Sequence, residues 1–439
     1  MCSIAGSLNR KEVETMLQTM KHRSPDEINL IVDKFFMGMG RLTILDTKSP
    51  GLCPYGDEKI VLSFNGEIYN FIELREELKG KGFQFRTTSD TEVLAKAYQV
   101  WGLKMFDKLN GMFAFAILEN DKIILARDIA GEKPLYYREN PFRFASEAKA
   151  LNWDCAEFPP AHYGVYDIRK KKLNLKQYWK LEPKEVRLKT ADEELEWLLE
   201  DSIKLRTRSD VPYGLYFSGG VDSSLIASFH DFKYKFNYKN KNYAREFRKT
   251  MPKICWHLDY PTSHFSPFGF WKLAEQASKK VKVILSGEGA DELFGGYVRY
   301  VQPHFNYLAQ KAFPSYNPMF SPAESVSQAG WREFYGNFQQ LLRIGDRMAG
   351  AWGIENRCPF LDKRIIQFAF SIPDELKING LETKVILKKI LKRRNPKWKD
   401  FEKEGMFIPV YKWFGQPQNY DKTKWLVYQM EQLKKFRSS

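Results

Sequence analysis

Residues 218–224 read Ser-Gly-Gly-Val-Asp-Ser-Ser, between an apolar stretch at 211–217 and an apolar run at 225–229. We expect a buried strand before this turn and a helix opening after it, because both flanks are short and apolar. A glycine turn between a strand and a helix binds anions, since the ligand can approach free backbone N–H groups. The serines add hydroxyl donors, and Asp222 adds a candidate metal ligand. The pattern predicts a phosphate-binding turn, and a plain Gly-Ser turn is the simpler alternative.

A second polar loop follows another apolar run. Residues 281–285 read Val-Lys-Val-Ile-Leu and lead into Ser-Gly-Glu-Gly-Ala-Asp-Glu at 286–292. Two parallel strands with polar side chains at their carboxyl ends are typical of a doubly wound sheet at its switch point. The two loops therefore indicate one site at the edge of such a sheet.

The other candidate for chemistry is at the start of the chain, where Cys2 follows Met1. A small second residue permits removal of the initiator methionine, which would leave a thiol and an α-amine on one residue. A thiol titrates near about 8.5 and an α-amine near about 7.7, so the amine can serve as the base for the thiol. A cysteine at position 2 means little alone, and its interpretation depends on the residues that follow.

Composition sets the broad class. A chain of 439 residues is too long for one ordinary core and suggests two domains. No apolar run approaches the length of a membrane span, and no signal-peptide pattern is present, so we expect neither a membrane protein nor a secreted one. The cysteines are scattered and include no CxxC pair, which indicates a reducing, cytoplasmic location without a disulfide framework. They are Cys2, Cys53, Cys155, Cys255 and Cys358.

The net charge of +15 raises the question of a nucleic-acid partner. The densest basic run, at 388–397, is interrupted by apolar residues at helical spacing, which favours a solvated helix face. An anionic substrate such as ATP also favours a positive surface. We therefore expect no nucleic acid, and an RNA-modifying enzyme stays open as an alternative suggested by charge alone.

The first half of the chain is expected to be an α+β layered domain. Strands are predicted at 59–64, 112–117 and 122–126, and helices at 70–79 and 90–101 with Asp90 as the N-cap. A charged stretch at 181–190 precedes a helix that begins near Ala191, so we place the domain boundary near residue 185. The predicted domains are 1–185 and 186–439, the second with helices around 322–341 and 367–370.

Motifs in both halves occur in an order that identifies a family. In chain order they are Met1-Cys2, His22 to Asp26, Arg41 to Ile44, Asn65 to Asn70, Ser89-Asp90, Gly111 to Phe115, Arg127-Asp128, Gly131 to Tyr137, Ala145 to Glu147, Ser218 to Ser224, Ser286 to Tyr297, Arg347-Met348, Trp352 to Asp362 and Lys384. With these motifs the chain resembles the glutamine-dependent asparagine synthetases over essentially its whole length. The resemblance implies an α+β N-terminal-nucleophile amidotransferase domain, followed by an α/β doubly wound domain of the adenine-nucleotide α-hydrolase type with a pyrophosphate loop.

The resemblance also implies roles in the first half. Cys2 would attack the side-chain amide of glutamine, and Asn65 with the N–H of Gly66 would form the oxyanion hole, whose donors stabilise charge that appears only in the transition state. A planar guanidinium suits a carboxylate, so Arg41 would bind that of glutamine. The implied glutamine-binding set is Arg41, Ile44, Asn65, Gly66, Glu67 and Asp90. Taken singly, Arg41 and Asp90 would indicate a surface ion pair and a helix cap, and Asn65-Gly66 would indicate a hairpin turn.

In the second half the resemblance implies an ATP site with Mg²⁺. The implied ATP-binding residues are Tyr216, Ser218, Gly219, Gly220, Asp222, Ser223, Ser224, Ser286 and Gly287. Asp222 and Asp291 would hold the metal, which prefers carboxylates and phosphate oxygens. Glu288 would act in adenylate formation and deprotonate the attacking ammonia, and Lys384 would stabilise the transferring phosphorus. For Arg347, Glu355 and Arg357, a structural ion-pair role stays open beside a functional one, and the histidines are expected to be structural.

The implied reaction has two stages. ATP and the β-carboxylate of aspartate would give a β-aspartyl-AMP and pyrophosphate. Ammonia released from glutamine at Cys2 would then cross an interior tunnel and form asparagine and AMP. The expected partners are these small molecules, and a homodimer is common in such a family.

Three departures from the family pattern keep alternatives open. Ser3 and Ser24 stand where the family usually has glycine, and a Cβ there could crowd the glutaminase site. The segment between Phe229 and Trp256 is shorter than usual; residues 233–238 could replace one adenine-binding strand, while the following strand and helix are expected to be missing. The alternatives are a related amidotransferase that acts on another carboxylate, such as a sugar acid or a natural-product precursor, and a non-catalytic homologue.

Overall fold

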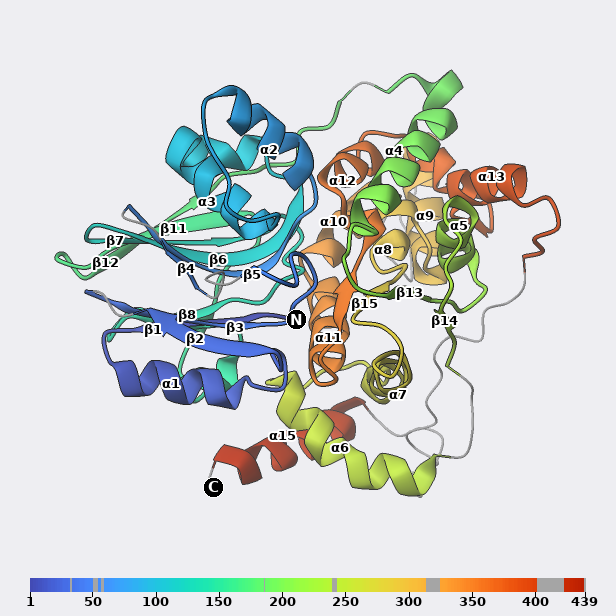
Figure 1. Ribbon diagram of the computed structural model, residues 1–439. Coiled ribbons are helices and arrows are strands. Elements are labelled where there is room, and N and C mark those ends of the chain that lie inside the picture. Colours follow the sequence, from blue (N-terminus) through green and yellow to red (C-terminus); the bar gives the residue numbers. More distant parts are fainter. Residues whose placement is uncertain are drawn as a thin grey trace.

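The structure is a computed structural model that describes residues 1–31, 34–49, 54–56, 59–184, 186–238, 243–312, 324–400 and 422–437. Figure 1 shows two halves side by side: strands β1 to β12 with their helices form the N-terminal half, and the chain from α4 onward forms the C-terminal half. In the described ranges, no helix is long and apolar enough to cross a membrane. The boundary predicted at residue 185 falls on a residue outside the described ranges.

The N-terminal half contains two six-stranded sheets. One has the order β10-β8-β9-β1-β3-β2 and the other the order β12-β11-β7-β6-β5-β4. The strands are β1 (Ser3–Ser7), β2 (Glu27–Ile31), β3 (Phe36–Arg41), β4 (Tyr55–Gly56), β5 (Val61–Ile68), β6 (Gly111–Glu119), β7 (Lys122–Arg127), β8 (Tyr136–Arg138), β9 (Arg143–Ala145), β10 (Ala156–Glu157), β11 (His162–Asp167) and β12 (Lys172–Gln177). The helices are α1 (Arg10–Thr19), α2 (Phe71–Gly80) and α3 (Asp90–Trp101).

The alternation of side chains along β6 explains the layers. Ala114, Ala116 and Leu118 belong to the core between the two sheets, together with Ile4 of β1. Phe113, Phe115 and Ile117 point to the other face and pack in the cluster that contains residues of α2 and α3. Helix α1 packs against β1 and β3 of the other sheet. The half is therefore a helix–sheet–sheet–helix sandwich, which is the α+β layered fold expected from the sequence.

The C-terminal half is built on a four-stranded parallel sheet with the order β14-β13-β15-β16. Its strands are β13 (Tyr213–Tyr216), β14 (Lys235–Phe236), β15 (Val283–Leu285) and β16 (Glu355–Arg357), and a separate hairpin has β17 (Ile378–Asn379) and β18 (Glu382–Thr383). The helices are α4 (Ala191–Arg206), α5 (Val221–Phe229), α6 (Ala244–Leu258), α7 (Pro267–Ala277), α8 (Ala290–Phe294), α9 (Val301–Ala312), α10 (Val326–Phe334), α11 (Asn337–Gly350), α12 (Lys363–Ala369), α13 (Val385–Arg394) and α15 (Lys422–Arg437). Strand β13 leads through the glycine turn at 218–220 into α5, which confirms the predicted order of strand, turn and helix.

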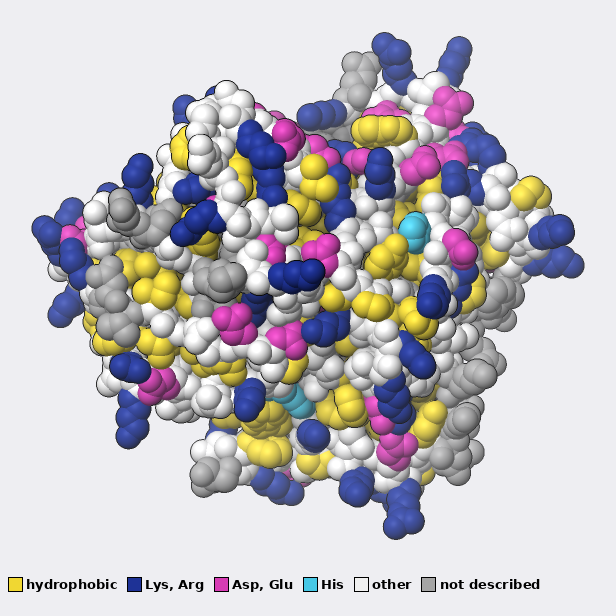
Figure 2. Space-filling model, viewed as in Figure 1, with side chains coloured by type: hydrophobic (Ala, Val, Ile, Leu, Met, Phe, Trp, Pro, Cys, Tyr) yellow, Lys and Arg dark blue, Asp and Glu magenta, His cyan; other side chains and the backbone are white. Residues whose placement is uncertain are grey.

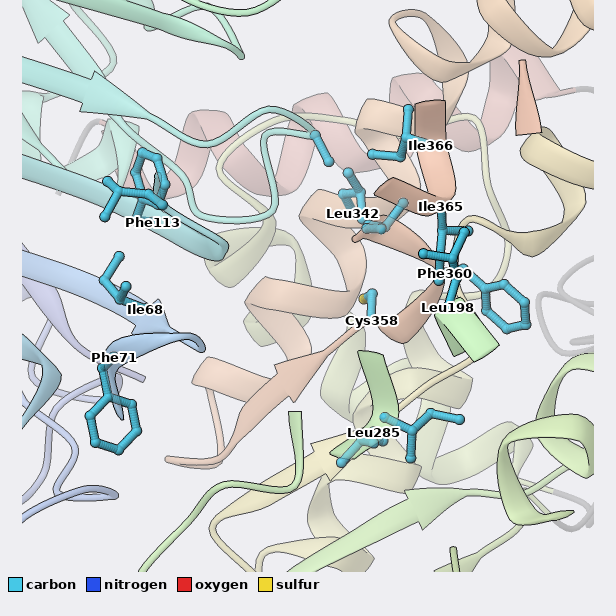
Figure 3. Packing of buried hydrophobic residues seen from close by; sticks show 14 of the residues in the cluster. Ile68, Phe71, Phe113, Leu198, Leu285, Leu342, Cys358, Phe360, Ile365 and Ile366 are labelled. Atoms are coloured by element: carbon cyan, nitrogen blue, oxygen red, sulfur yellow. The ribbon is translucent and has the colours of Figure 1, made fainter. Parts of the chain in front are cut away.

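A continuous hydrophobic cluster joins the two halves. It contains Ile68 and Phe113 of the N-terminal half with Leu198, Leu285 and Cys358 of the C-terminal half. Figure 3 shows the sulfur of Cys358 near the middle of this cluster, between these two groups of residues. The start of the chain also lies where the halves meet (Figure 1). This part of the contact is therefore apolar, and its burial holds the two halves in one arrangement.

Several expectations about elements need correction. Ser89, not Asp90, is the N-cap of α3: its side chain accepts a hydrogen bond from the backbone N–H of Thr91, and Asp90 is the first helical residue. Residues 235–236 form β14 beside β13, as expected for the replacement strand. In the described residues between β14 and α6 no further strand occurs, and the chain continues into α6; that the family's next strand and helix are missing here stays a prediction. Pro322, in the range 322–341, lies outside the described residues.

Basic side chains are spread over the surface. Figure 2 shows Lys and Arg across the visible face, mixed with Asp and Glu rather than gathered in one patch. On α13, Lys389 and Arg393 bind Asp192 of α4, and Arg394 binds Glu196. The basic run at 388–397 is thus paired in large part with an acidic helix, in agreement with a solvated helix face.

Candidate functional site

Cys2 lies at the interface, directly before β1. Its thiol donates to the carbonyl of Leu42 at 3.9 Å, and burial raises the pKa of the thiol to about 11. The preceding Met1 is fully buried, its ammonium donates to the carbonyl of Arg23 at 2.9 Å, and burial lowers the pKa of that ammonium to about 5. The side chain of Met1 packs in a cluster with Tyr216 and other residues of the C-terminal half. While Met1 is present, Cys2 carries no α-amine of its own, and the neighbouring Met1 ammonium offsets only part of the effect of burial on the pKa of the thiol.

Asn65 and Gly66 lie on β5, whose neighbour is β6. Both polar atoms of the Asn65 side chain are buried and have no hydrogen-bond partner. A buried amide without partners costs free energy, so such an arrangement points to a ligand that would complete it. Gly66 has a φ of 148°, and a Cβ at this position would meet the carbonyl oxygen of Met112 at 2.0 Å. Only glycine therefore fits at position 66.

Arg41 and Ile44 are held by backbone groups. Arg41 ends β3, is buried, and donates from Nη2 to the carbonyls of Leu45 and Asp46 at 2.8 Å each. The carbonyl of Ile44 accepts a hydrogen bond from the N–H of Asp210 in the C-terminal half, at 3.1 Å. Ile44 therefore also fixes one half against the other.

Glu67 and Asp90 lie close together and have different partners. Glu67 forms an ion pair with Arg357 of β16, with 3.1 Å between Oε1 and Nη2. Asp90 accepts a hydrogen bond from the N–H of Ile68 at 2.9 Å, and burial raises the pKa of its carboxyl to about 6. The two carboxylates that the sequence assigns to one glutamine site are thus adjacent, and Glu67 also contacts the other half.

The glycine turn forms an open helix N-terminus. Gly219 has a φ of 80°, and Gly220 is the N-cap of α5 without a side-chain capping bond. The hydroxyl of Ser223 lies 3.2 Å from the N–H of Ser218, and the hydroxyl of Ser224 donates to the carbonyl of Gly219 at 2.8 Å. These bonds shape the turn and leave the first-turn N–H groups of α5 for an anion.

Asp222 and Asp291 meet at the end of one lysine side chain. The Nζ of Lys384 lies 2.6 Å from Oδ1 and 2.7 Å from Oδ2 of Asp222, and 2.6 Å from Oδ1 of Asp291. The two carboxylates raise the pKa of Lys384 above its ordinary value. Lys384 has a φ of 54°, a strained backbone for a residue with a Cβ, at the N-cap of α13. The structure therefore brings together the three charged groups that the sequence assigned to metal binding and phosphoryl chemistry.

Two carboxylates at one point fit a Mg²⁺ ion in charge and ligand type. In the described part of the chain, no group of three or more His, Cys, Asp or Glu side chains is arranged to hold a metal. A magnesium ion at Asp222 and Asp291 would therefore take its other ligands from water and from nucleotide phosphates, as this ion commonly does.

Glu288 follows β15 and lies beside the phosphate turn. Its Oε2 accepts hydrogen bonds from Ser286 Oγ at 3.0 Å and from the amide of Asn356. Burial raises the pKa of its carboxyl to about 7. Gly287 packs against Asp222, where a Cβ would lie only 2.7 Å from the Cβ of that residue, and Tyr216 is buried at the end of β13. The loop of Ser286, Gly287 and Glu288 therefore adjoins the glycine turn through Gly287, and the roles of these residues toward ATP stay a prediction.

The sequence did not reveal a buried ion-pair network between the halves. Arg23 binds both carboxylate oxygens of Asp346 at 2.7 and 3.1 Å and donates from Nε to the carbonyl of Cys2. Arg347 reaches Glu147 and Asp259, and Glu147 also binds Lys149. Arg347, Glu355 and Arg357 all take part in buried ion pairs, and Arg357 also binds Glu67 of the proposed glutamine site, so both a structural and a functional role stay open for them.

Asn356 and Cys358, which touch Glu288, were also missed. The strand that carries Asn356, Glu355–Arg357, is short and entirely polar, so its pattern is not that of a buried strand. It joins the sheet because its charges find partners there: Glu355 pairs with Arg357 and with Lys133 of the N-terminal half. The usable signal was that Asn356 and Cys358 lie inside the motif from Trp352 to Asp362, within which no role was predicted for these two residues.

Comparison with known proteins gives a consistent result. Residues 1–166 match the glutamine amidotransferase domain family, and residues 194–239, 234–340 and 321–431 match the asparagine synthase family. The chain is 30% identical to the glutamine-hydrolyzing asparagine synthetase 1 of Bacillus subtilis, over 95% of this chain and 89% of that protein. It is 31% identical to the glutamine-hydrolyzing asparagine synthetase 3 of Arabidopsis thaliana, over 86% and 70%, and 29% identical to that of Sandersonia aurantiaca, over 95% and 85%.

Proposed function

This chain belongs to the family of glutamine-hydrolyzing asparagine synthetases, and from this premise we propose that it makes asparagine from aspartate, glutamine and ATP. Residues 1–185 would release ammonia from glutamine, and residues 186–439 would activate the acceptor carboxylate. The observation that carries the proposal is the convergence of Asp222, Asp291 and Lys384 beside an open helix N-terminus.

For the glutaminase reaction we assign the nucleophile to Cys2 after removal of Met1. The new α-amine would then lie on the same residue as the thiol and accept its proton. The unpartnered amide of Asn65 and the N–H of Gly66 would stabilise the oxyanion that forms when the thiol adds to the amide. Arg41 would bind the carboxylate of glutamine, and Asp90 with Glu67 its ammonium; Ile44 shapes the same pocket.

For the synthetase reaction we assign the phosphates to the turn at 218–224. The N–H groups of α5 and the hydroxyls of the serines would bind the leaving pyrophosphate. Mg²⁺ at Asp222 and Asp291 would neutralise charge on the phosphates, and Lys384, displaced from these carboxylates, would move to the transferring phosphorus. The products would be β-aspartyl-AMP and pyrophosphate, and ammonia would displace AMP while Glu288 accepts its proton.

The test is product analysis with the purified full chain. Mg-ATP, ammonium and a panel of carboxylates led by aspartate are incubated, and pyrophosphate, AMP and the amide product are measured. Equal amounts of asparagine, AMP and pyrophosphate support the proposal. Turnover with another acid only, or no pyrophosphate with any acid, contradicts it. Mass spectrometry of the intact chain shows whether Met1 has been removed.

A further inference from the structure

Three buried oxygen acceptors around Cys358 have no hydrogen-bond donor. They are Oε1 of Glu288, Oδ1 of Asn356 and Oε2 of Glu132. Glu132 and Asn356 are each only 8% exposed. A buried acceptor without a donor is costly, and the three side chains that carry these acceptors are linked through the thiol of Cys358, so a donor-rich ligand between them would lower this cost.

Cys358 connects these groups. Its sulfur lies 3.7 Å from Oε2 of Glu288 and 3.7 Å from the amide nitrogen of Asn356. Figure 3 places this sulfur between the two halves of the molecule. Glu132 approaches from the N-terminal half, since its carboxylate and the thiol of Cys358 shift each other's pKa. The cluster is therefore made by both halves and exists only when they are packed together.

Glu132 has no assigned part in the proposed reaction. It lies between β7 and β8, and its backbone N–H donates to Asp128 at 2.9 Å. Burial raises the pKa of its carboxyl to about 8, and the charge of Asp128 adds to this effect. A small cavity at the interface is lined by Glu132 together with Asn110, Asp128, Leu361 and Lys363. A buried acidic group beside a cavity is thus available to a small ligand.

The chemistry of the cluster favours ammonium over other small ligands. Ammonium offers four N–H donors and a positive charge, whereas the cluster offers oxygen acceptors and two carboxyl groups. Water would satisfy the acceptors, but it is too weak a base to share the proton of the Glu132 carboxyl, as ammonia can. The proposed function delivers ammonia to Glu288, so the ligand is produced where the site could receive it.

We propose that Glu132, Asn356 and Glu288, arranged around Cys358, form a holding site for ammonium at the interface of the two halves. This inference rests on the proposed function for the source of the ligand. Ammonia that reaches Glu132 shares the proton of its carboxyl, either as ammonia with the neutral acid or as ammonium with the carboxylate. When ammonia moves on to attack the acyl-adenylate, that proton stays on the carboxyl of Glu132. The holding site therefore neither gains nor loses a proton in one turnover.

Binding is tested first, without catalysis. The melting temperature of the full chain is measured in increasing ammonium chloride, with sodium chloride at equal ionic strength as reference and potassium chloride as a second cation. We expect ammonium to raise the melting temperature above the sodium reference, and E132Q to lose most of this increase. Glu119→Gln is the matched control, because Glu119 lies at the far end of β6 and bonds to Tyr98. No ammonium-specific increase in the wild type, or an equal increase with potassium, overturns the proposal.

Kinetics then test whether the site serves synthesis. In E132Q the KM for ammonium should rise by about tenfold or more, the scale of one lost charged hydrogen bond, while the KM for ATP stays within about twofold. With glutamine, more glutamate than AMP should form, because ammonia escapes. An unchanged KM for ammonium and an unchanged product ratio overturn the proposal. If the wild type makes no amide from any acid, the proposed function fails, while the melting experiment still decides the ammonium site.

Discussion

The two candidate sites differ in how their polar groups are paired. In the N-terminal half, the amide of Asn65 is buried without a partner on a strand in the middle of a sheet. In the C-terminal half, Lys384 binds Asp222 and Asp291, so these charges satisfy one another. The Asn65 amide therefore lacks a hydrogen-bond partner within the protein, whereas Lys384, Asp222 and Asp291 neutralise one another.

The difference follows from the elements that carry the groups. Asn65 and Gly66 lie on β5 and pair with Ala114 and Phe113 of β6, whereas β4 pairs with β5 only at Val61 and Leu62. The pairing with β6 limits how far this backbone can move to give the Asn65 side chain new partners. Asp222, Asp291 and Lys384 lie at helix starts and loop ends, and the lysine has a long side chain. A buried lysine between two carboxylates offsets their desolvation until a dication replaces it. The residues proposed for glutamine are therefore already held in place, whereas the residues proposed for ATP would have to break their ion pairs to take up metal and nucleotide.

The largest expected effect is that of Cys2→Ala. Loss of the nucleophile should lower glutamine-dependent synthesis by about 10⁴-fold or more, while synthesis with added ammonium continues. Both rates are measured by AMP formation. Cys155→Ala, a half-buried cysteine in the same half, is the control and should change neither rate. Equal loss with both nitrogen sources would show that the two sites do not act separately.

The second test asks whether Lys384 stands in for a metal. Lys384→Met should reduce pyrophosphate release by about 10²–10³-fold. It leaves two facing carboxylates, so we expect about 3 kcal/mol of lost stability, part of which magnesium chloride restores. Magnesium alone should therefore raise the melting temperature of K384M more than that of the wild type.

The control for this experiment is Lys389→Met on the same helix, whose side chain is largely exposed and pairs with Asp192. Its response to magnesium should match the wild type. An equal response in all three proteins would mean that Asp222 and Asp291 do not form the metal site.

The third test compares Asn65, whose amide has no hydrogen-bond partner, with Asn70, whose amide forms structural hydrogen bonds. Asn65→Ala should lower the rate of glutamine hydrolysis by about 10²–10³-fold without reducing stability through lost hydrogen bonds, because its amide makes none. Asn70→Ala is the converse: Asn70 binds Lys108 and Asn110, so its loss should cost about 1–2 kcal/mol and leave hydrolysis near normal. The measurements are glutamate release and chemical denaturation. The same pattern in both variants would remove Asn65 from the oxyanion hole.

The smallest expected effect is on pH dependence. Burial raises the pKa of Glu288 to about 7, so synthesis with ammonium should slow by about tenfold per unit below that pH if Glu288 must accept a proton. The folded state then holds a proton that the unfolded state loses near its ordinary pKa of 4.5. This carboxyl therefore lowers the free energy of unfolding as the pH rises from 4.5 toward 7.

Glu288→Gln should remove both effects. The residual rate of the variant should be flat across this pH range, and the difference in unfolding free energy between the two proteins should change with pH in the stated direction. A wild type and variant with parallel pH profiles would exclude Glu288 as the titrating group.

The sequence predicted elements best where one periodicity decided them. Helix α3 has the predicted bounds, 90–101, and β7 was predicted within one residue. The predicted N-cap of α3 was wrong because serine and aspartate are both favourable caps, so the residue types of Ser89 and Asp90 do not decide between them. Only the backbone angles of the folded chain do. Strand β16 was missed because its residues are polar and become a buried strand only through partners such as Lys133.

By itself the sequence determined the candidate groups: Cys2, the glycine turn and the two aspartates are visible in local order and spacing, and the two fold classes follow from these patterns together with the family resemblance. Only the tertiary structure decided which groups are paired. Lys384 and Asp222 are far apart in the chain, and their pairing depends on how α13 packs against α5 within the C-terminal half. Arg23 and Asp346 are also far apart, and their pairing depends on how the two halves pack. The spacing of residues predicts which local structure a short segment can form. Burial, charge pairing and unpartnered acceptors arise only when segments distant in the chain pack together and exclude water.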